Sequence, residues 1–206
     1  MKERFNTFIS AIFAGICIST GAAIFLSLDN KIVGSFLFAI GLFLVLTFSL
    51  NLFTGKICYA LDNKPSYIID IILIWLGNLV GCLFMAAILG QTRIAGLSEK
   101  ALSLCNVKLA DSYISLFILG VFCNFFIYIA VEGFKNNSHE VGKYLGVIFG
   151  VMGFILCGTE HCVADMFYIC FAGAWSADMF LRLIIITLGN VVGGIGFKTL
   201  HYYLKK

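Results

Sequence analysis

The stretch from Phe154 to Ala172 constrains the fold of this chain most strongly. It is apolar at both ends, yet its middle reads Gly158-Thr159-Glu160-His161. A titratable side chain inside a membrane segment is costly and is retained mostly where it faces a cavity or pathway. A break in the helical backbone at that depth is tolerated only where it is buried in protein or lines a water-filled space. We therefore expect the functional site at this interrupted helix.

The composition predicts an integral membrane protein, with residues 1–206 forming one transmembrane domain. Of the 206 residues, 61% are hydrophobic and 12% charged, whereas a soluble domain is about half apolar and a quarter charged. The net charge of +3 is small and its basic residues lie in loops, so a nucleic-acid partner has no support. The eight cysteines are scattered singly and favour buried packing over a disulfide framework.

Six segments are each near the length of about 20 apolar residues that a bilayer crossing requires. They are residues 8–28, 32–50, 69–89, 112–133, 144–157 and 179–203. The second is followed by a break at 51–56 and a short apolar tail, and the fifth resumes after its break as 161–172. Residues 91–111 form a mixed, partly amphipathic connection. The predicted fold is an all-α membrane bundle of six transmembrane helices with the second and fifth interrupted.

The distribution of lysine and arginine predicts the orientation of the chain. With both termini inside, the inner loops hold Lys2, Arg4, Lys64, Lys135, Lys143, Lys205 and Lys206, and the outer loops hold Lys31, Arg93, Lys100, Lys108 and Arg182. This modest excess follows the positive-inside rule. We therefore expect a multi-pass protein of the cell membrane with both termini in the cytoplasm.

An internal repeat is visible in the third and sixth segments. Gly77-Asn78-Leu79-Val80-Gly81 matches Gly189-Asn190-Val191-Val192-Gly193, and each copy follows an interrupted segment. The repeats, about 7–90 and 112–203, contain three crossings each and must therefore run in opposite directions through the membrane. Inverted repeats with interrupted helices indicate a transport pathway near the bilayer midplane.

Other classes of protein fit less well. Glu160, His161 and Cys162 are metal-ligand types, but consecutive residues cannot all face one ion, so we expect no metal and no cofactor. No span carries the Gly-x-Ser-x-Gly pattern of a serine hydrolase, so we expect no enzyme. A water channel of the aquaporin type would need Asn-Pro-Ala at both breaks, and the chain has no such triplet.

Three motifs together resemble the formate/nitrite transporter family over nearly the whole chain. They are Leu52-Phe53-Thr54-Gly55, the segment Glu160-His161-Cys162-Val163-Ala164-Asp165-Met166, and the two Gly-Asn-x-x-Gly copies. The resemblance implies an aquaporin-like fold in a homopentamer, each protomer having its own pore in the lipid bilayer. It also implies a small monovalent anion or its weak acid as substrate, with formate, nitrite, hydrosulfide and lactate as candidates.

The resemblance also implies roles for individual residues. His161 matches the central pore histidine, Thr54 the threonine that faces it, Asn124 the asparagine close to it, and Lys108 the vestibule lysine that draws anions in. Apolar constrictions fall at Phe38, Leu42 and Phe154. The loops at the two breaks contain Leu52, Phe53, Gly55, Gly158, Thr159 and Glu160.

Several of these residues also have simpler interpretations. Thr54 could cap the short helix that follows it, and Asn124 could hydrogen-bond across helices. Without the resemblance, Lys108 would be interpreted as a solvated loop charge. Capping or an interhelical hydrogen bond is the default for Glu160 and Asp165.

The chain departs from the family pattern in two ways. Cys162 and Asp165 stand where family members often have a small hydroxyl residue and an asparagine. The termini and connections are also short, so a terminal gating segment is not expected to be carried over.

The residues suggest how a bare anion could cross an apolar constriction, where the cost of desolvation is on the order of tens of kcal/mol. Lys108 would concentrate anions by its field. A histidine has an unperturbed pKa of about 6.5 and can give and recover a proton near neutral pH. We expect the anion to meet His161 and Thr54, take or share a proton, and cross as a neutral acid. A proton-coupled secondary active transporter of the same anions is the alternative, and the sequence does not choose among the anions.

Overall fold

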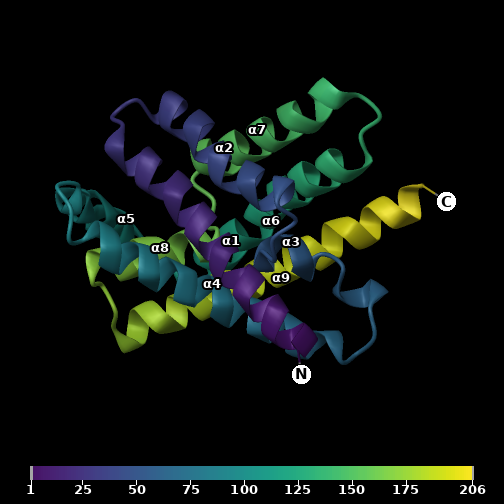
Figure 1. The fold of residues 1–206 in the computed structure, drawn as a ribbon, viewed down its shortest axis with the longest axis horizontal. Helices are drawn as coiled ribbons and strands as arrows, with labels where there is room; N and C mark the ends of the chain where they lie inside the picture. The colour runs from purple at the N-terminus through teal and green to yellow at the C-terminus, as the bar shows by residue number, and fades with distance from the viewer. Residues whose placement is uncertain (1, 206) are drawn as a thin grey trace.

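A computed structural model describes residues 2–205, and it is all-helical over that range (Figure 1). The helices are α1 (Lys2–Ser27), α2 (Lys31–Thr47), α3 (Phe53–Ile57), α4 (Tyr67–Leu89), α5 (Ser98–Ala110), α6 (Tyr113–Asn136), α7 (Glu140–Leu156), α8 (Cys162–Ala172) and α9 (Ala177–Leu204), with 3-10 turns at Ala60–Asp62 and Ala95–Leu97. The predicted all-α class is confirmed.

Four helices are long and apolar enough to cross a membrane: α1, α4, α6 and α9. Helices α2 and α8 are shorter but also apolar. The chain breaks between α2 and α3 and between α7 and α8. The second break falls where it was predicted, but the first lies earlier than the predicted 51–56. Residues 53–56, including Phe53 and Gly55 of the expected loop, belong to α3, which begins at Phe53 because Asn78 accepts the amide hydrogen of that residue. The piece after the first break, α3, has only five residues, and the connection at 91–111 contains the 13-residue helix α5.

Polar side chains define where several helices begin. The Asn30 side chain accepts hydrogen bonds from the amides of Ile32 and Val33 at the start of α2. Ser112 and Ser176 accept in the same way at the starts of α6 and α9. Each cap satisfies backbone donors that have no partner inside the helix, so these polar residues set the helix boundaries between apolar runs.

Close helix pairs form the core of the molecule. Helix α1 packs on α4 and α6 packs on α9, while α2 lies beside α7 and α5 beside α8 (Figure 1). Glycines allow the first two contacts, because a Cβ at Gly81 would overlap the carbonyl of Ile12 and one at Gly193 would overlap that of Val121. Small residues that let backbones approach in this way are typical of helix contacts in membranes.

An asparagine from each Gly-Asn-x-x-Gly copy fixes the start of a short helix. Asn78 of α4 accepts a hydrogen bond from the amide of Phe53, at 2.9 Å, where α3 begins. Asn190 of α9 accepts one from the amide of Cys162, at 3.0 Å, where α8 begins.

The amide nitrogens of the same two asparagines complete a matching pair of networks. Asn78 donates to the carbonyls of Ala11 and Asn51, and Asn190 donates to those of Gly120 and Glu160. Both asparagines are fully buried. The two repeat motifs therefore hold the two short helices in equivalent ways.

Candidate functional site

The two breaks meet at a hydrogen bond between His161 and Thr54. His161 immediately precedes α8, and Thr54 lies in the first turn of α3. The His161 Nε2 and Thr54 Oγ1 atoms are 2.9 Å apart, and both side chains are buried. The expected pairing of these two residues is present.

The partners of the imidazole ring fix its tautomer. His161 Nδ1 lies 3.1 Å from the backbone nitrogen of Ala164, and a backbone amide can only donate. Nδ1 is therefore an acceptor without a proton, and a neutral ring carries its hydrogen on Nε2. That N–H donates to the Thr54 hydroxyl, so His161 caps α8 with one nitrogen and faces the other break with its only donor.

Asn124 of α6 contacts Thr54 rather than His161. Its Nδ2 donates to the Thr54 carbonyl at 3.1 Å, which is the interhelical hydrogen bond of the simpler interpretation. Its Oδ1 is buried and has no hydrogen-bond partner among residues 2–205. Asn124 thus positions α3, and any direct contact with a substrate stays a prediction.

Aromatic rings cover the histidine on one side. The Phe154 ring stacks on His161 with centroids 5.4 Å apart, and Phe38 meets Phe154 edge to face at 5.7 Å. Phe38, Phe154 and Leu42 are all buried. The three expected constriction residues therefore lie in the core, and their effect on a permeating molecule stays a prediction.

Lys108, Glu160 and Asp165 form a buried cluster of charged residues. Lys108 Nζ lies 2.5 Å from Glu160 Oε2 and 3.0 Å from Asp165 Oδ1, and the three residues are 7%, 6% and 2% exposed. Burial lowers the pKa of Lys108, but Asp165 and Glu160 raise it further and leave it above its ordinary value. Lys108 is therefore a cation.

The contacts in this cluster differ from those that the simpler interpretations of its three residues predict. Lys108 is not a solvated loop charge, and the carboxylates of Glu160 and Asp165 contact its ammonium instead of capping a helix. The backbone of Glu160 is held separately, because its amide donates to the Leu119 carbonyl and its carbonyl accepts from Asn190. Thr159 likewise bonds the Phe154 carbonyl through its hydroxyl, and Gly158 turns the chain with φ at +67°.

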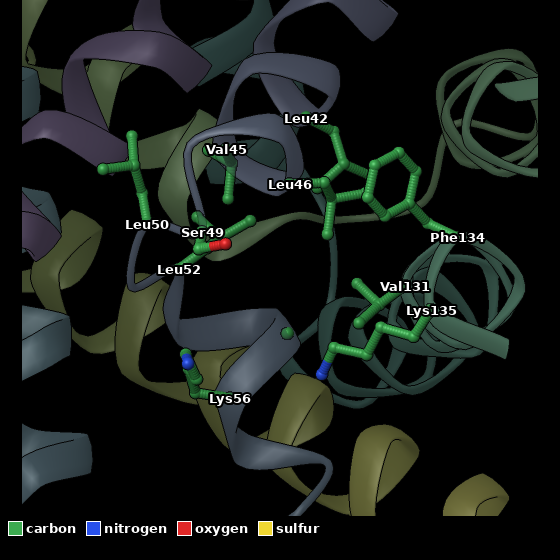
Figure 2. A pocket seen from close by; sticks show the side chains of 11 residues that line it. Leu42, Val45, Leu46, Ser49, Leu50, Leu52, Lys56, Val131, Phe134 and Lys135 are labelled. Carbon is green, nitrogen blue, oxygen red and sulfur yellow. The ribbon is translucent and has the colours of Figure 1, made fainter. Parts of the chain in front are cut away.

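Two cavities lie toward opposite ends of α2. One, of about 160 Å³, includes Lys31 at the start of α2 together with Phe154, His161, Lys108, Glu160 and Asp165. The other, of about 400 Å³, lies at the far end of α2 and is shown in Figure 2. Its lining residues are Leu42, Val45, Leu46, Ser49, Leu50, Leu52, Gly55, Lys56, Val131, Phe134 and Lys135.

The larger cavity contains two lysines that sequence reasoning did not single out. Lys56, from α3, and Lys135, from α6, both line this cavity, and Figure 2 shows Lys135 extending from α6 toward α3. Neither forms an ion pair with a carboxylate of residues 2–205, although Lys135 Nζ lies 4.2 Å from the ring centroid of Tyr59. The position of Lys56 directly after Leu52-Phe53-Thr54-Gly55 was the available signal.

No group of three or more histidine, cysteine, aspartate or glutamate side chains in the described range is arranged to hold a metal ion. An all-helical chain with long apolar helices, two short helices meeting at a buried histidine, and a cavity toward each end has the architecture of a multi-pass membrane transport protein.

The chain belongs to the formate/nitrite transporter family, whose model matches residues 2–204. It is 30% identical to the formate channel BtFdhC of Bacillus thuringiensis, over 84% of this chain and 72% of that protein. It is 29% identical to the formate channel FocA of Haemophilus influenzae, over all of this chain and 88% of that protein. A solved structure described as a pentameric formate channel with formate bound superposes with a TM-score of 0.80 at 26% identity, covering 99% of this chain and 98% of that one.

Proposed function

We propose that this protein is a membrane channel for small monovalent anions or their weak acids, with formate, nitrite and hydrosulfide as the candidate substrates. Family membership and the formate-channel relatives support this class of substrate. The observation that carries the proposal is the buried hydrogen bond between His161 and Thr54, with a cavity toward each end of α2.

The assembly is a homopentamer in the cell membrane, and each protomer has its own pathway. Similarity to a pentameric formate channel supports the oligomer. Within the protomer, six crossings form two inverted halves at about 7–90 and 112–203, and both termini are cytoplasmic. The matching hydrogen bonds of Asn78 and Asn190 at the starts of α3 and α8 support the paired halves.

The pathway joins the two cavities through the centre of the protomer. From the larger cavity, Lys56 and Lys135 attract an anion by their unpaired charges. Leu42 and Leu52 border this cavity and separate it from the central pair of His161 and Thr54. Phe38 and Phe154 then narrow the route toward the second cavity.

At the centre, His161 shares a proton with the substrate through Nε2. The N–H that now bonds to Thr54 is redirected to an oxygen of the anion, with the threonine hydroxyl as a second donor. Sharing the proton spreads the negative charge of the anion, which lowers the cost of its passage through the apolar constrictions. Lys108 contributes less attraction than an isolated lysine would, because its charge is offset within the cluster that it forms with Glu160 and Asp165.

The test compares wild-type protein with His161→Asn and His161→Phe in proteoliposomes. Stopped-flow uptake of formate, nitrite and hydrosulfide is measured at two pH values. We expect His161→Asn to lower the rates, because an amide N–H shares its hydrogen with an anion less readily than the imidazole Nε2–H does. We expect His161→Phe to lose uptake. If both variants match wild type for all three anions at both pH values, proton sharing by His161 is wrong.

A proton-coupled secondary active transporter of the same anions is the second candidate. It is favoured by the carboxylates of Glu160 and Asp165, which place further proton-binding groups in the same cavity as His161. Uptake that saturates with formate concentration identifies this candidate. Uptake that rises in proportion to formate concentration identifies the channel, because both candidates accumulate formate under an imposed pH gradient when the substrate crosses as a neutral acid.

A further inference from the structure

The charges of the buried cluster do not balance. Lys108 supplies one positive charge, and Glu160 and Asp165 supply two negative charges when both are ionised. All three side chains are more than nine-tenths buried. An excess buried charge is costly, and two carboxylates that share a site do not both ionise readily. One proton held by the two carboxylates makes the cluster neutral.

The hydrogen bonds favour Asp165 as the group that holds this proton. Glu160 makes the shorter contact with Lys108, at 2.5 Å, and Asp165 the longer one, at 3.0 Å. The second carboxyl oxygen of Asp165, Oδ2, is buried without a hydrogen-bond partner among residues 2–205. An ionised oxygen without a donor is expensive, whereas a protonated Oδ2 is itself a donor. Asp165 also lines the cavity of about 160 Å³ that contains His161.

The remaining ionisable groups around Asp165 leave this charge count unchanged. The groups that face Asp165 are Cys105 and Lys108 of α5, Cys123 of α6, Glu160, and Cys162 and Tyr168 of α8. Lys31 and His161 line the same cavity. Arg182 of α9 pairs with Asp178. Thiols and phenols are neutral near pH 7, and Lys31 stands at the exposed start of α2.

His161 is poorly placed to bring in a proton of its own. As an imidazolium it would carry a hydrogen on Nδ1, which now accepts the Ala164 amide at the start of α8. Charging the ring would therefore remove this cap and place the new Nδ1–H against the backbone N–H of Ala164, so that two donors face each other. The neutral ring can share the hydrogen on Nε2, but a net proton must come from another group.

We propose that Asp165 is the group that supplies a proton to the incoming anion in the cavity beside His161. The Asp165 Oδ2–H bond breaks and an O–H bond forms on formate or nitrite, or an S–H bond on hydrosulfide. The anion becomes a neutral acid, and the cluster takes over its negative charge. A proton from the aqueous solution then returns to Asp165, so one proton enters for each anion. This inference rests on the proposed function and names the proton donor for it.

The first test is infrared spectroscopy of the full-length protein in lipid, without substrate, at neutral pH. We expect wild type to show the C=O band of a protonated carboxylic acid, and Asp165→Asn to lose it. Glu160→Gln should also lose it, because Asp165 is then the only carboxylate beside Lys108 and ionises. The matched control is Asp29→Asn, since Asp29 pairs with Lys100 at the surface and lies outside the cluster; it should keep the band. Equal elution of all variants as oligomers establishes that they fold.

The second test measures the pH dependence of formate uptake in proteoliposomes, with uptake by protein-free liposomes subtracted. We expect wild type and Asp29→Asn to gain uptake on acidification and Asp165→Asn to lose that gain. A wild type that moves none of the three anions overturns the proposed function itself. A wild type that transports but lacks the acid band, or an Asp165→Asn or Glu160→Gln protein that keeps it, overturns this inference alone. This inference is also overturned if uptake by Asp165→Asn still rises on acidification.

Discussion

At the scale of single residues, the two nitrogens of His161 have separate partners. Nδ1 accepts the Ala164 amide and Nε2 donates to the Thr54 hydroxyl. Because the backbone contact fixes the tautomer, the side that faces Thr54 always presents a donor while the ring is neutral. In the proposed pathway this donor carries no full charge, which suits a site where an anion must not be trapped.

The Thr54 hydroxyl can be removed with little change of shape. We expect Thr54→Val to destabilise the protein by about 1–3 kcal/mol, because it leaves the buried Nε2–H of His161 without an acceptor. Thr54→Ser keeps the hydroxyl and should stay close to wild type. Thermal unfolding in detergent, with formate uptake measured in parallel, compares the two variants. A valine variant as stable and as active as the serine variant would contradict a role for this contact.

The sequence indicated some of these residues and could not indicate others. His161 and Thr54 stand at breaks in apolar segments, so their position alone makes them candidates. The pairing of Lys108 with Glu160 joins residues 52 positions apart, and no periodicity relates a connecting loop to the end of a distant span. Lys56 and Lys135 come together for the same reason only in three dimensions, since they lie on α3 and α6.

At the scale of helices, the close contacts of α1 with α4 and of α6 with α9 position the two short helices. Asn78 and Asn190 can hold α3 and α8 only because glycines bring their own helices against α1 and α6. The breaks were predictable, since polar residues and glycine interrupt apolar runs. The five-residue length of α3 and the helix α5 were not, because neither has an apolar periodicity that marks its ends.

Two glycines of α9 allow the effect of close packing on stability to be measured separately from the effect of helix propensity. A Cβ at Gly193 would lie 2.9 Å from the carbonyl carbon of Val121, whereas one at Gly196 would meet nothing within 4 Å. We expect Gly193→Ala to lower stability by about 1–3 kcal/mol through overpacking. Gly196→Ala should be neutral or slightly stabilising, because alanine favours the helix. Thermal unfolding of both variants in detergent provides the comparison, and equal midpoints would contradict the close contact.

At the scale of the whole molecule, apolar side chains cover much of the surface. Phenylalanine, leucine and isoleucine are exposed along the helices, including Phe13 at 54%, Phe84 at 52%, Phe122 at 52% and Phe149 at 63%. A soluble protein rarely exposes so much apolar area. We expect lipid and neighbouring protomers to cover this apolar surface, in agreement with the membrane class to which the comparisons assign the chain.

The orientation of the chain can be tested with a single native cysteine. Cys157 at the end of α7 is the exposed cysteine of the described range, since the others are buried or half-buried. With both termini cytoplasmic, Cys157 faces the outside. We expect a membrane-impermeant maleimide to label intact cells carrying wild type and not those carrying Cys157→Ser. Labelling that appears only after the cells are broken would reverse the predicted orientation.

The guanidinium group of Arg182 links two parts of the molecule that are far apart in sequence. Its Nη1 donates to the carbonyls of Lys108 and Asp111, both at 2.7 Å, where α5 ends and α6 is about to begin. Such bonds to a charged donor contribute about 1.5–3 kcal/mol each. A swing of α5 away from α9 would have to break both bonds at once, so the backbone that carries the ammonium of the buried cluster is anchored. Passage of a substrate past the cluster, as proposed, would therefore rely on side-chain rotation.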